Sequence, residues 1–398
     1  MKLKSFTEKD VRGKKVLLRV DFNVPRKGGE VSDTTRIEAH EKTIKKLLKA
    51  GATVVLTSHL GRPKGKYNEE FSLRDVAPAV EKVLSLSTVF CGDCIGPKVE
   101  ESLAALKDGE VLLLENLRFH PGEQENNRSF ARDLASPFDV FVMDAFSASH
   151  RADASTSSVM EFLPSFAGDL LQKEVDMLDV ACRNPEPPFV LILGGAKVSD
   201  KIGVIENLLD RVNTILIGGG MAFTFLKAEG GGIGKSLCEE ERIDFAAEML
   251  SRATSAGVEI LLPMDVIAGS SLDAKEGVQT VSARKIPESL MGLDIGPETA
   301  RIFARKAAEA RTILWNGPMG VFENPLFASG TLEVAKGVAE CTRKGGTTVV
   351  GGGDTASAAK ALGFDGDVSH VSTGGGASLE FCEGKDLPGI APLILKEK

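Results

Sequence analysis

Cysteine is scarce in this chain, and its few copies are widely scattered. They stand at positions 91, 94, 182, 238, 341 and 382 of the 398 residues. Thiols so few and so dispersed exclude a small scaffold held together by disulfides. Cys91 and Cys94 have the CxxC spacing, but no second pair accompanies them. Zinc or redox chemistry and ordinary reduced thiols are therefore the two alternatives there.

Long uncharged runs and an excess of basic charge are also missing. The longest uncharged run, Val212–Leu226, contains three glycines and is shorter than the roughly 20 residues of a membrane helix. The segment up to Leu18 carries several lysines and lacks the apolar stretch of a secretory signal. A formal net charge of −8 excludes a protein that coats nucleic acid, which would be basic overall. We expect a cytoplasmic protein without membrane or nucleic-acid partners, and a monomer because no coiled-coil pattern occurs.

Glycine, by contrast, is abundant, and charge is unevenly distributed. The 42 glycines form short runs rather than a repeat. Residues 1–170 carry 25 basic and 25 acidic side chains, whereas residues 171–398 carry 23 and 31, so the second half holds the whole acidic excess. The length of 398 residues predicts two or three domains.

Short apolar runs rich in β-branched residues recur along the chain, and helical stretches follow them. Continuous apolar runs of this length are typical of strands covered on both faces, so the alternation predicts an α/β fold with mostly parallel sheets. One predicted helix covers Thr34–Ala50, where Ile37, Ile44, Leu47 and Leu48 share a face. The expected strands are 16–20, 53–57, 111–114, 140–143, 189–193, 214–217, 259–262, 312–315 and 347–350.

A domain boundary is expected near the middle of the chain. Residues 164–182 read as one helix, and the proline-rich segment 184–188 ends it. This pattern predicts two doubly wound domains joined by an interdomain helix, with one large domain as the alternative. Because ligands of open α/β sheets bind beyond the carboxyl ends of the strands, the residues after each apolar run are the candidate site residues.

In the first half, cationic side chains follow four different strands. The guanidinium fork of arginine binds carboxylate and phosphate groups, so a convergent set predicts a site for a small, multiply charged anion. The alternative for each is a solvated charge or a local ion pair. The candidates are Arg36, His59, Arg62, Arg118 and Arg151.

Other polar residues at the same strand ends allow more than one role. No serine or cysteine nucleophile stands at motif spacing from His59, His120 or His150, so we interpret His59 and His150 as no more than anion contacts. Asp21 and Asn23 are candidates to hold a substrate hydroxyl, and Asp21 could equally brace a neighbouring arginine.

In the second half, the strand ends are rich in glycine, at 194–195, 218–220, 351–353 and 374–376. Glycine lets backbone N–H groups approach an anion, and a helix N-terminus favours it electrostatically. Gly352–Thr355 should lie at such an N-terminus and cradle phosphate. Lys197 and Lys201 would share a helix face and add positive charge.

Two nucleotide motifs fail closer inspection. Residues 229–236 resemble a P-loop, but Glu229 stands where that motif requires glycine. Gly351-x-Gly353-x-x-Ala356 fits a dinucleotide variant, yet Gly374 stands where an acidic residue should hold a ribose.

Asp354 lies in the segment expected to cradle phosphate. A carboxylate there would repel phosphate unless a cation lies between them, which predicts Mg²⁺; the structural alternative is that Asp354 is the N-cap of the following helix. Trp315 belongs either to a loop that binds the base and ribose or to the hydrophobic core.

Seven motifs together closely resemble the phosphoglycerate kinase family, in order and over nearly the whole chain. They are RVDFNVP (19–25), SHLGRP (58–63), ENLRFHPG (115–122), LGGAKVSDK (193–201), WNGPMGVFE (315–323), GGGDT (351–355) and VSTGGGAS (371–378).

The resemblance implies an enzyme that moves a phosphoryl group between MgATP and 3-phosphoglycerate, making or consuming 1,3-bisphosphoglycerate. On matching positions it assigns phosphoglycerate to Asp21, Asn23, Arg36, His59, Arg62, Arg118 and Arg151. It assigns the nucleotide to Lys201, Gly292, Glu323, Gly352, Gly353, Asp354 and Thr355, with Glu323 at the ribose and Asp354 at the Mg²⁺. Arg36, Lys197, Gly374, Gly375 and Gly376 would contact the transferred group.

The resemblance also implies domain limits. The last residues, 379–398, would return to an N-terminal domain of 1–168, and 169–378 would form the nucleotide domain. One position departs from the family: Asp153 stands where a histidine is usual, which puts a negative charge near the anion site and predicts weaker substrate binding. The rival functions are another kinase that forms acyl phosphates and a catalytically silent protein that clamps an anion.

Overall fold

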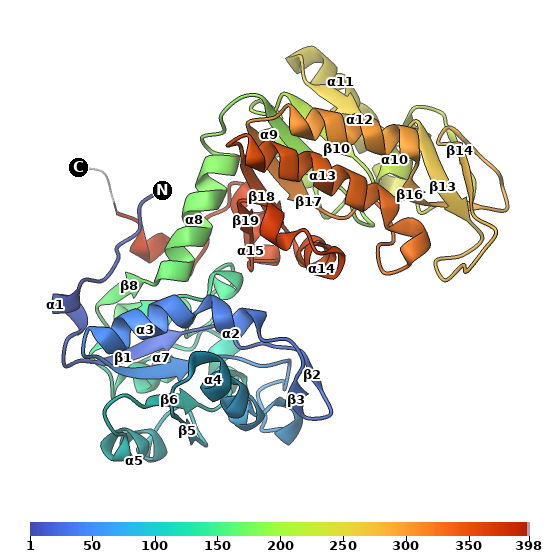
Figure 1. Cartoon of the computed structure of the whole chain (residues 1–398). Coiled ribbons are helices and arrows are strands. Elements are labelled where there is room, and N and C mark those ends of the chain that lie inside the picture. Colours follow the sequence, from blue (N-terminus) through green and yellow to red (C-terminus); the bar gives the residue numbers. More distant parts are fainter. Residues whose placement is uncertain (396–398) are drawn as a thin grey trace. The chain divides into compact units, whose positions relative to one another are not determined.

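Two compact units make up the computed structural model, which describes residues 1–395 (Figure 1). Unit 1 contains Met1–Asp176 and the segment that begins at Asp386, and unit 2 contains Met177–Lys385. The helix α8 (Asp169–Cys182) carries the chain from one unit into the other. Within the described range, no helix combines the length and apolar character needed to cross a membrane.

A six-stranded, wholly parallel sheet in the order β5-β6-β4-β1-β7-β8 forms the centre of unit 1. Its inner strands are fully buried along almost their whole length because helices cover both faces. From β1 the chain passes to β4 and then to the edge strand β5, places β6 between these two, and crosses to β7 on the other side of β1, so the strand order reverses beside β1. The strands are β1 (Lys15–Arg19), β4 (Thr53–Thr57), β5 (Thr88–Cys91), β6 (Val111–Leu114), β7 (Val140–Met143) and β8 (Ser165–Ala167).

Seven α-helices and a small hairpin complete unit 1 before α8. The hairpin pairs β2 (Arg26–Lys27) with β3 (Glu30–Val31). The helices are α1 (Glu8–Val11), α2 (Thr35–Ala39), α3 (Glu41–Lys49), α4 (Ala77–Leu84), α5 (Pro97–Ala105), α6 (Pro121–Gln124) and α7 (Arg128–Ala135).

Unit 2 repeats the plan with a second parallel sheet, in the order β12-β10-β9-β17-β18-β19. Its strands are β9 (Phe189–Leu193), β10 (Thr214–Ile217), β12 (Glu259–Leu261), β17 (Thr312–Asn316), β18 (Thr347–Gly351) and β19 (His370–Val371). Both units are thus doubly wound α/β structures, which confirms the predicted fold class.

Smaller sheets and seven helices surround this second sheet. An antiparallel sheet contains β13 (Asp265–Gly269), β14 (Gln279–Ser282) and β16 (Met291–Ile295), and β11 (Gly232–Ile233) pairs with β15 (Lys285–Ile286). The helices are α9 (Ile202–Leu208), α10 (Ala222–Ala228), α11 (Ile243–Ala256), α12 (Pro297–Ala308), α13 (Ser329–Arg343), α14 (Gly353–Leu362) and α15 (Gly376–Cys382).

The helix predicted over residues 34–50 is interrupted, so that prediction was wrong. It is split at His40 into α2 and α3. The His40 ring is buried, accepts a hydrogen bond from the Asp21 N–H at Nε2 (2.9 Å) and lies 2.7 Å from the Asp144 carboxylate through Nδ1. The single apolar stripe could not show this break, because both partners of His40 lie on other strand ends.

The helix predicted over 164–182 is also wrong in its first turn. Residues 165–167 form β8 instead, because they pair in parallel with β7. The helix begins only after Gly168, where one Asp144 carboxylate oxygen accepts hydrogen bonds from the N–H groups of Leu170 (3.0 Å) and Leu171 (3.3 Å). A side chain at Gly168 would collide with that carboxylate, since an added Cβ would lie 2.0 Å from Oδ1.

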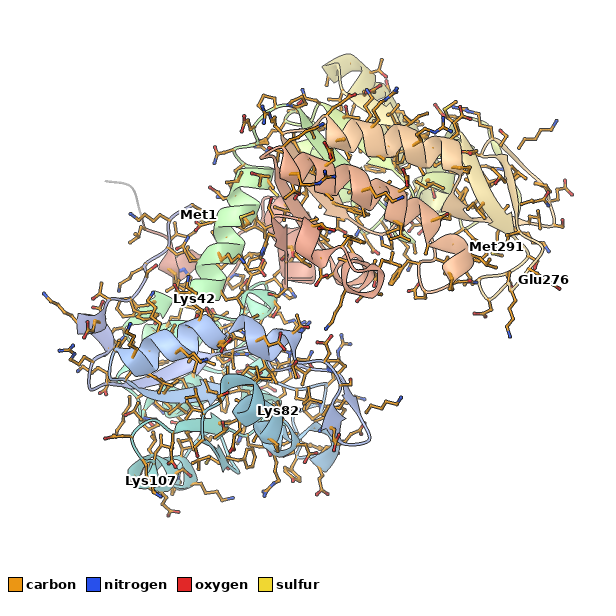
Figure 2. The ribbon with its side chains drawn as sticks, in the orientation of Figure 1. Met1, Lys42, Lys82, Lys107, Glu276 and Met291 are labelled. Carbon is orange, nitrogen blue, oxygen red and sulfur yellow. The ribbon has the colours of Figure 1, made fainter. Side chains whose placement is uncertain are left out.

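The terminal segments lie together in unit 1. Lys4 N–H donates to the Leu393 carbonyl (2.8 Å), and Leu395 N–H donates to the Lys2 carbonyl (3.0 Å). The helix α15 (Gly376–Cys382) belongs to unit 2, so the returning segment begins at Asp386 rather than at residue 379. Residues 396–398 of that expected segment lie outside the described residues. Charged side chains such as Lys82, Lys107 and Glu276 are exposed (Figure 2).

Candidate active site

The carboxyl end of β1 carries a buried, charge-paired aspartate. The Oδ2 atom of Asp21 lies 2.6 Å from Arg36 Nη1 and also accepts from the Ser147 hydroxyl, while Oδ1 accepts from the Asn23 N–H (3.0 Å). Burial alone would raise the pKa of Asp21, but Arg36, His59 and these hydrogen bonds hold it well below its ordinary value. Asp21 is therefore ionised and braces Arg36, one of the two roles that the sequence left open.

His59, which follows β4, is neutral. Burial drives its pKa well below the ordinary value; Asp21 opposes this shift, and Arg19, Arg118 and Arg151 add to it. Arg19 Nη2 lies 3.2 Å from His59 Nδ1. Because a guanidinium only donates, Nδ1 accepts and the proton resides on Nε2. His59 thus offers a hydrogen-bond donor to a ligand rather than a positive charge.

Arg118, which follows β6, is anchored at one end. Its Nη1 donates to the Gly61 carbonyl (2.8 Å), and the Gly61 N–H donates to Asn23 Oδ1 (2.9 Å), so the backbone of one residue contacts both candidate residues. The Nε atom of Arg118 is buried and has no hydrogen-bond partner among the described residues. A buried donor without a partner is costly, and an anion would satisfy it.

The positive side chains of this edge repel one another. Burial lowers the pKa of Arg118, and the neighbouring charges of Arg151 and Arg19 lower it further. Asp153 partly offsets the repulsion, with Oδ2 3.9 Å from Arg118 Nη2. The structure thus brings Asp21, Asn23, Arg36, His59, Arg118 and Arg151 into one interacting network, while Arg62 is exposed next to Gly61. We call this network the arginine cluster.

Sequence reasoning missed two supports of the arginine cluster. Arg19 is completely buried within β1, where Nε donates to Ser155 Oγ (2.8 Å), and that hydroxyl donates to Glu123 (2.6 Å). Ser147 holds Asp21. The signal for Arg19 was a charged residue inside an apolar run, which requires a buried partner.

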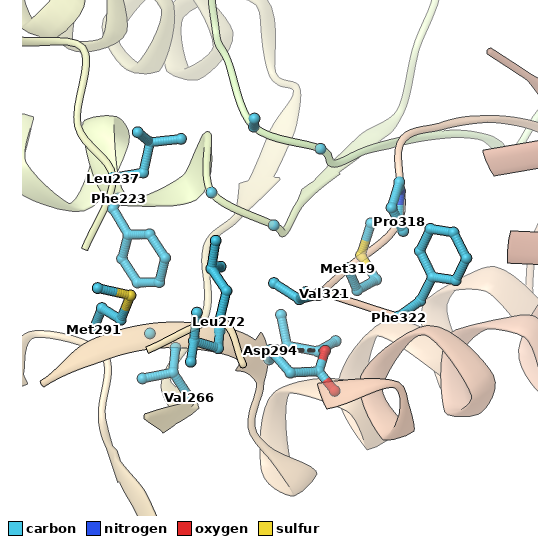
Figure 3. Close-up of a pocket in the computed structure, with 18 of the residues that line it drawn as sticks. Phe223, Leu237, Val266, Leu272, Met291, Asp294, Pro318, Met319, Val321 and Phe322 are labelled. Carbon is cyan, nitrogen blue, oxygen red and sulfur yellow. Dashed lines mark hydrogen bonds between the residues drawn. The ribbon is translucent and has the colours of Figure 1, made fainter. Parts of the chain in front are cut away.

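Two cavities open at the strand ends of unit 2. The larger one, of about 640 Å³, is lined by apolar side chains such as Phe223 and Met291 together with glycines (Figure 3). The smaller one, of about 390 Å³, is lined by Lys197, Lys201, Gly375, Gly376 and the Gly352–Thr355 segment. Gly195, Ala196 and Asp354 line both. An apolar hollow next to a polar, glycine-lined one has the shape and chemistry of a nucleotide site.

Glycine brings the loops after β9 and β17 together. Gly195 N–H donates to the Pro318 carbonyl (3.0 Å), and Gly317 has a φ of 102°. An added Cβ at Gly194 would lie 2.2 Å from the Pro318 carbonyl oxygen. No other residue type permits this close backbone approach.

The smaller cavity lies at the start of α14. Gly352 caps the helix with a φ of 88°, and Asp354 stands in the first turn, so Asp354 is not the N-cap that the structural alternative supposed. Lys201 Nζ donates to Asn316 Oδ1 (2.6 Å); burial lowers its pKa, which Asp200 and Asp354 partly offset. Lys197 is exposed beside it, and Gly374 N–H donates to Ser372 Oγ (3.0 Å).

The larger cavity contains a residue that the sequence did not single out. Asp294 is 3 % exposed and accepts from the N–H groups of Gly330 (2.7 Å) and Ile295 (2.9 Å). Burial raises its pKa to about 7 despite these bonds. Its carboxyl lies among apolar side chains (Figure 3). Asp294 is recognisable only by its burial and its hydrogen-bond partners, and the neighbouring residues in the sequence show neither.

Besides Asp354, two predicted residues line this larger cavity, and Trp315 does not. Gly292 and Glu323 line it, and a Cβ at Gly292 would lie 2.2 Å from the Phe223 ring. Trp315 is fully buried and stacks on Phe364 with ring centroids 5.3 Å apart, so it is core.

Comparison with known proteins gives one consistent result. The family model for phosphoglycerate kinase matches residues 6–385. The chain is 54 % identical to the phosphoglycerate kinase of Moorella thermoacetica over 97 % of its length and 98 % of the relative. It is 50 % identical to that of Pelotomaculum thermopropionicum over the full length of both. The solved phosphoglycerate kinase structure from Coxiella burnetii superposes with a TM-score of 0.86 at 42 % identity, covering 98 % of each chain. The solved Pyrococcus horikoshii OT3 enzyme gives 0.80 at 32 % identity, with 96 % of each chain covered. The chain therefore belongs to the phosphoglycerate kinase family.

Proposed function

We propose that this chain reversibly transfers a phosphoryl group between MgATP and 3-phosphoglycerate. Its family makes it a kinase of glycolysis. The observation that most supports these substrates is the contrast between the arginine cluster of unit 1, whose Arg118 Nε is buried without a partner, and the glycine-lined double cavity of unit 2. One suits a small polyanion, and the other suits a nucleotide.

In unit 1, the arginine cluster and Arg62 bind phosphoglycerate. Arg118 and Arg151 neutralise its phosphate, Arg62 adds an exposed charge, and the Nε2–H of His59 donates to an anionic oxygen. Asp21 holds Arg36 by an ion pair of 2.6 Å, so Arg36 is fixed in place before substrate binds. Asp21 and Asn23 accept from the substrate hydroxyl.

In unit 2, the larger cavity takes the base and ribose. Gly292 leaves space beside Phe223, and Glu323 is exposed at the wall to bind ribose hydroxyls. The phosphates extend into the smaller cavity, where Gly352, Gly353 and Thr355 present the N-terminus of α14 and Lys201 adds charge.

The residues present fit Mg²⁺. Asp354 is an exposed carboxylate at the junction of both cavities, and one carboxylate with phosphate oxygens and waters is the coordination that Mg²⁺ prefers. Bound there, Mg²⁺ would neutralise charge on the nucleotide phosphates.

For transfer, the carboxylate of phosphoglycerate attacks the γ-phosphorus in line and forms an acyl phosphate bond, which gives 1,3-bisphosphoglycerate. The bond between the γ-phosphorus and the β–γ bridging oxygen breaks on the opposite side, and ADP leaves with that electron pair. The attacking carboxylate is already ionised, so no residue has to act as a base. Arg36, Lys197 and the amides of Gly374–Gly376 stabilise the charge on the equatorial oxygens. Because the acceptor and donor residues belong to different units, the two half-sites must meet during each turnover, which also excludes water.

A coupled assay of ATP consumption tests this proposal. We expect consumption with 3-phosphoglycerate and none with acetate or aspartate, the acceptors that a different acyl-phosphate kinase would use. Equal rates with acetate would overturn the substrate assignment. Binding of phosphoglycerate without exchange of label between ADP and ATP would instead identify a silent binding protein.

A further inference from the structure

A mixed group of potential metal ligands lies in unit 1, apart from the residues assigned to phosphoglycerate. It contains Asp93, Cys94 and His120, and one ligand atom of each lies within 4.8 Å of the others. Asp93 and Cys94 follow β5, and His120 follows β6, the neighbouring strand of the sheet. Parallel strands end at one edge, so residues 26 positions apart in the sequence meet there.

The backbone and the rings around this group hold it in place. His120 Nε2 lies 2.9 Å from Asp93 Oδ1, and the Cys94 N–H donates to the same oxygen (2.8 Å). The His120 ring stacks on Phe130 with centroids 5.3 Å apart. Cys94 is buried, whereas the side chains of Asp93 and His120 are about one-third exposed, so an ion has access from solvent.

We propose that Asp93, Cys94 and His120 form a binding site for Zn²⁺. On binding, the Cys94 sulfur forms a bond to the metal and releases its proton to solvent, the neutral imidazole of His120 and the Asp93 carboxylate supply nitrogen and oxygen, and water fills the fourth position. Thiolate and imidazole ligands select Zn²⁺ over Mg²⁺, which requires an octahedron of oxygens. Metal-to-ligand bonds are about 2.0–2.3 Å long, so the ligand atoms need shift by only about 1 Å.

Cobalt(II) is a spectroscopic probe for such a site. The full-length chain, reduced and freed of metal with a chelator, should bind one equivalent of Co²⁺ and develop visible bands of a tetrahedral ion together with a thiolate-to-cobalt band in the near ultraviolet. Added Zn²⁺ should abolish these bands. Absence of the thiolate band with the wild-type chain would overturn the proposal.

Variants test the ligands one by one. Loss of even an outer partner of a ligand typically costs about 10–100-fold in metal affinity, so Cys94→Ser and His120→Gln should weaken Co²⁺ binding by at least about tenfold. The matched control Cys238→Ser changes a thiol in unit 2, and Asp354→Asn removes the proposed magnesium ligand; both should bind Co²⁺ as the wild type does. Unchanged affinity in Cys94→Ser and His120→Gln would contradict the proposed ligands.

A second measurement needs no variant and so does not depend on whether the variants fold. X-ray absorption of the zinc-loaded wild-type chain should show one sulfur at about 2.3 Å together with nitrogen or oxygen neighbours. A shell of oxygen and nitrogen alone would place the metal elsewhere and overturn the site.

Discussion

Under the proposed function, the two units would attract an anion in different ways. Unit 1 has buried guanidinium groups: Arg19 and Arg118 are at most 5 % exposed. Hydroxyl and carbonyl oxygens accept their hydrogen bonds, and nearby carboxylates offset part of their charge. Unit 2 uses backbone amides at glycine-rich strand ends, and its Lys197 is exposed. In the proposed assignment, unit 2 would contact phosphate groups through backbone N–H groups, which attract an anion without changing the net charge of the acidic second half.

The two units also differ in how each affects the pKa of a buried aspartate. Asp21 in unit 1 has a pKa held below the ordinary value by Arg36, His59 and hydrogen bonds that outweigh burial. Asp294 in unit 2 has no ion pair among the described contacts, and burial raises its pKa to about 7. The same side chain is thus stabilised as an anion in one unit and destabilised in the other.

The largest effect is expected from removing one cation of each unit. Arg36→Ala and Lys197→Ala should each lower kcat by about 100-fold or more, because each would stabilise charge that develops only during transfer. The coupled assay measures this, and Lys82→Ala, an exposed lysine of unit 1, is the control. If both variants stayed within about threefold of wild type, the proposed charge stabilisation would be wrong.

The aspartate contrast predicts opposite responses of stability to pH. An unfolded aspartate titrates near pH 3.9. The stabilisation from Asp21 is therefore fully present above about pH 4 and is lost only as pH falls further toward its lowered folded-state pKa. Asp21→Asn should cost about 2 kcal/mol at pH 7, and this cost should begin to shrink as pH falls from about 4 to 3 without disappearing. The penalty of Asp294 develops as pH rises from about 4 to 7, so Asp294→Asn should become increasingly more stable than wild type over that range.

Chemical denaturation of the wild type and both variants from pH 3 to pH 8 measures these differences. If the free energies of unfolding of the two variants changed with pH in the same way relative to the wild type, the proposed difference between Asp21 and Asp294 would be wrong.

The dependence of unit 2 on backbone conformation predicts a smaller effect. Gly352 has a φ of 88°, and an added Cβ would lie 3.0 Å from the Asn316 side chain, so Gly352→Ala should lower the free energy of unfolding by about 1–2 kcal/mol. Gly353→Ala is the matched control, since no heavy atom lies within 4 Å of its added Cβ and alanine favours the helix. Equal losses in both would show that Gly352 is not conformationally required.

The smallest effect concerns Asp153, which lies near the arginine cluster. Its carboxylate is 3.9 Å from Arg118, so Asp153→Asn should lower the Kd for 3-phosphoglycerate by about two- to fivefold, because the substrate no longer competes with a fixed anion. Calorimetric titration measures this, and Asp153→Glu keeps the charge as a control. Weaker binding by Asp153→Asn would mean that Asp153 chiefly positions Arg118.

The buried strands were the most predictable part of the fold. Runs such as 140–143 and 189–193 coincide with β7 and β9, because strands covered on both faces must be apolar throughout. The antiparallel strand β14 was not expected, since its residues are largely exposed and its pairing with β13 alone makes it a strand. The break at His40 was missed because its cause, the carboxylate of Asp144, lies 104 residues away.

The proposed site shows a similar division. Strand-end positions identified Asp21, His59, Arg118 and Asp354, since a parallel sheet gathers the residues that follow its strands at one edge. The supporting residues Arg19 and Asp294 lie within strands, where only their three-dimensional partners reveal them.

The sequence by itself determined which segments become buried strands, which residues follow them and which family the motifs resemble, because these depend on local period and spacing. Only the tertiary structure decided that His59 is neutral, that Asp21 is ionised while Asp294 titrates near neutrality, and that Cys94 and His120 meet. These properties depend on burial and on charges far away in the chain, whose interactions strengthen once water is excluded.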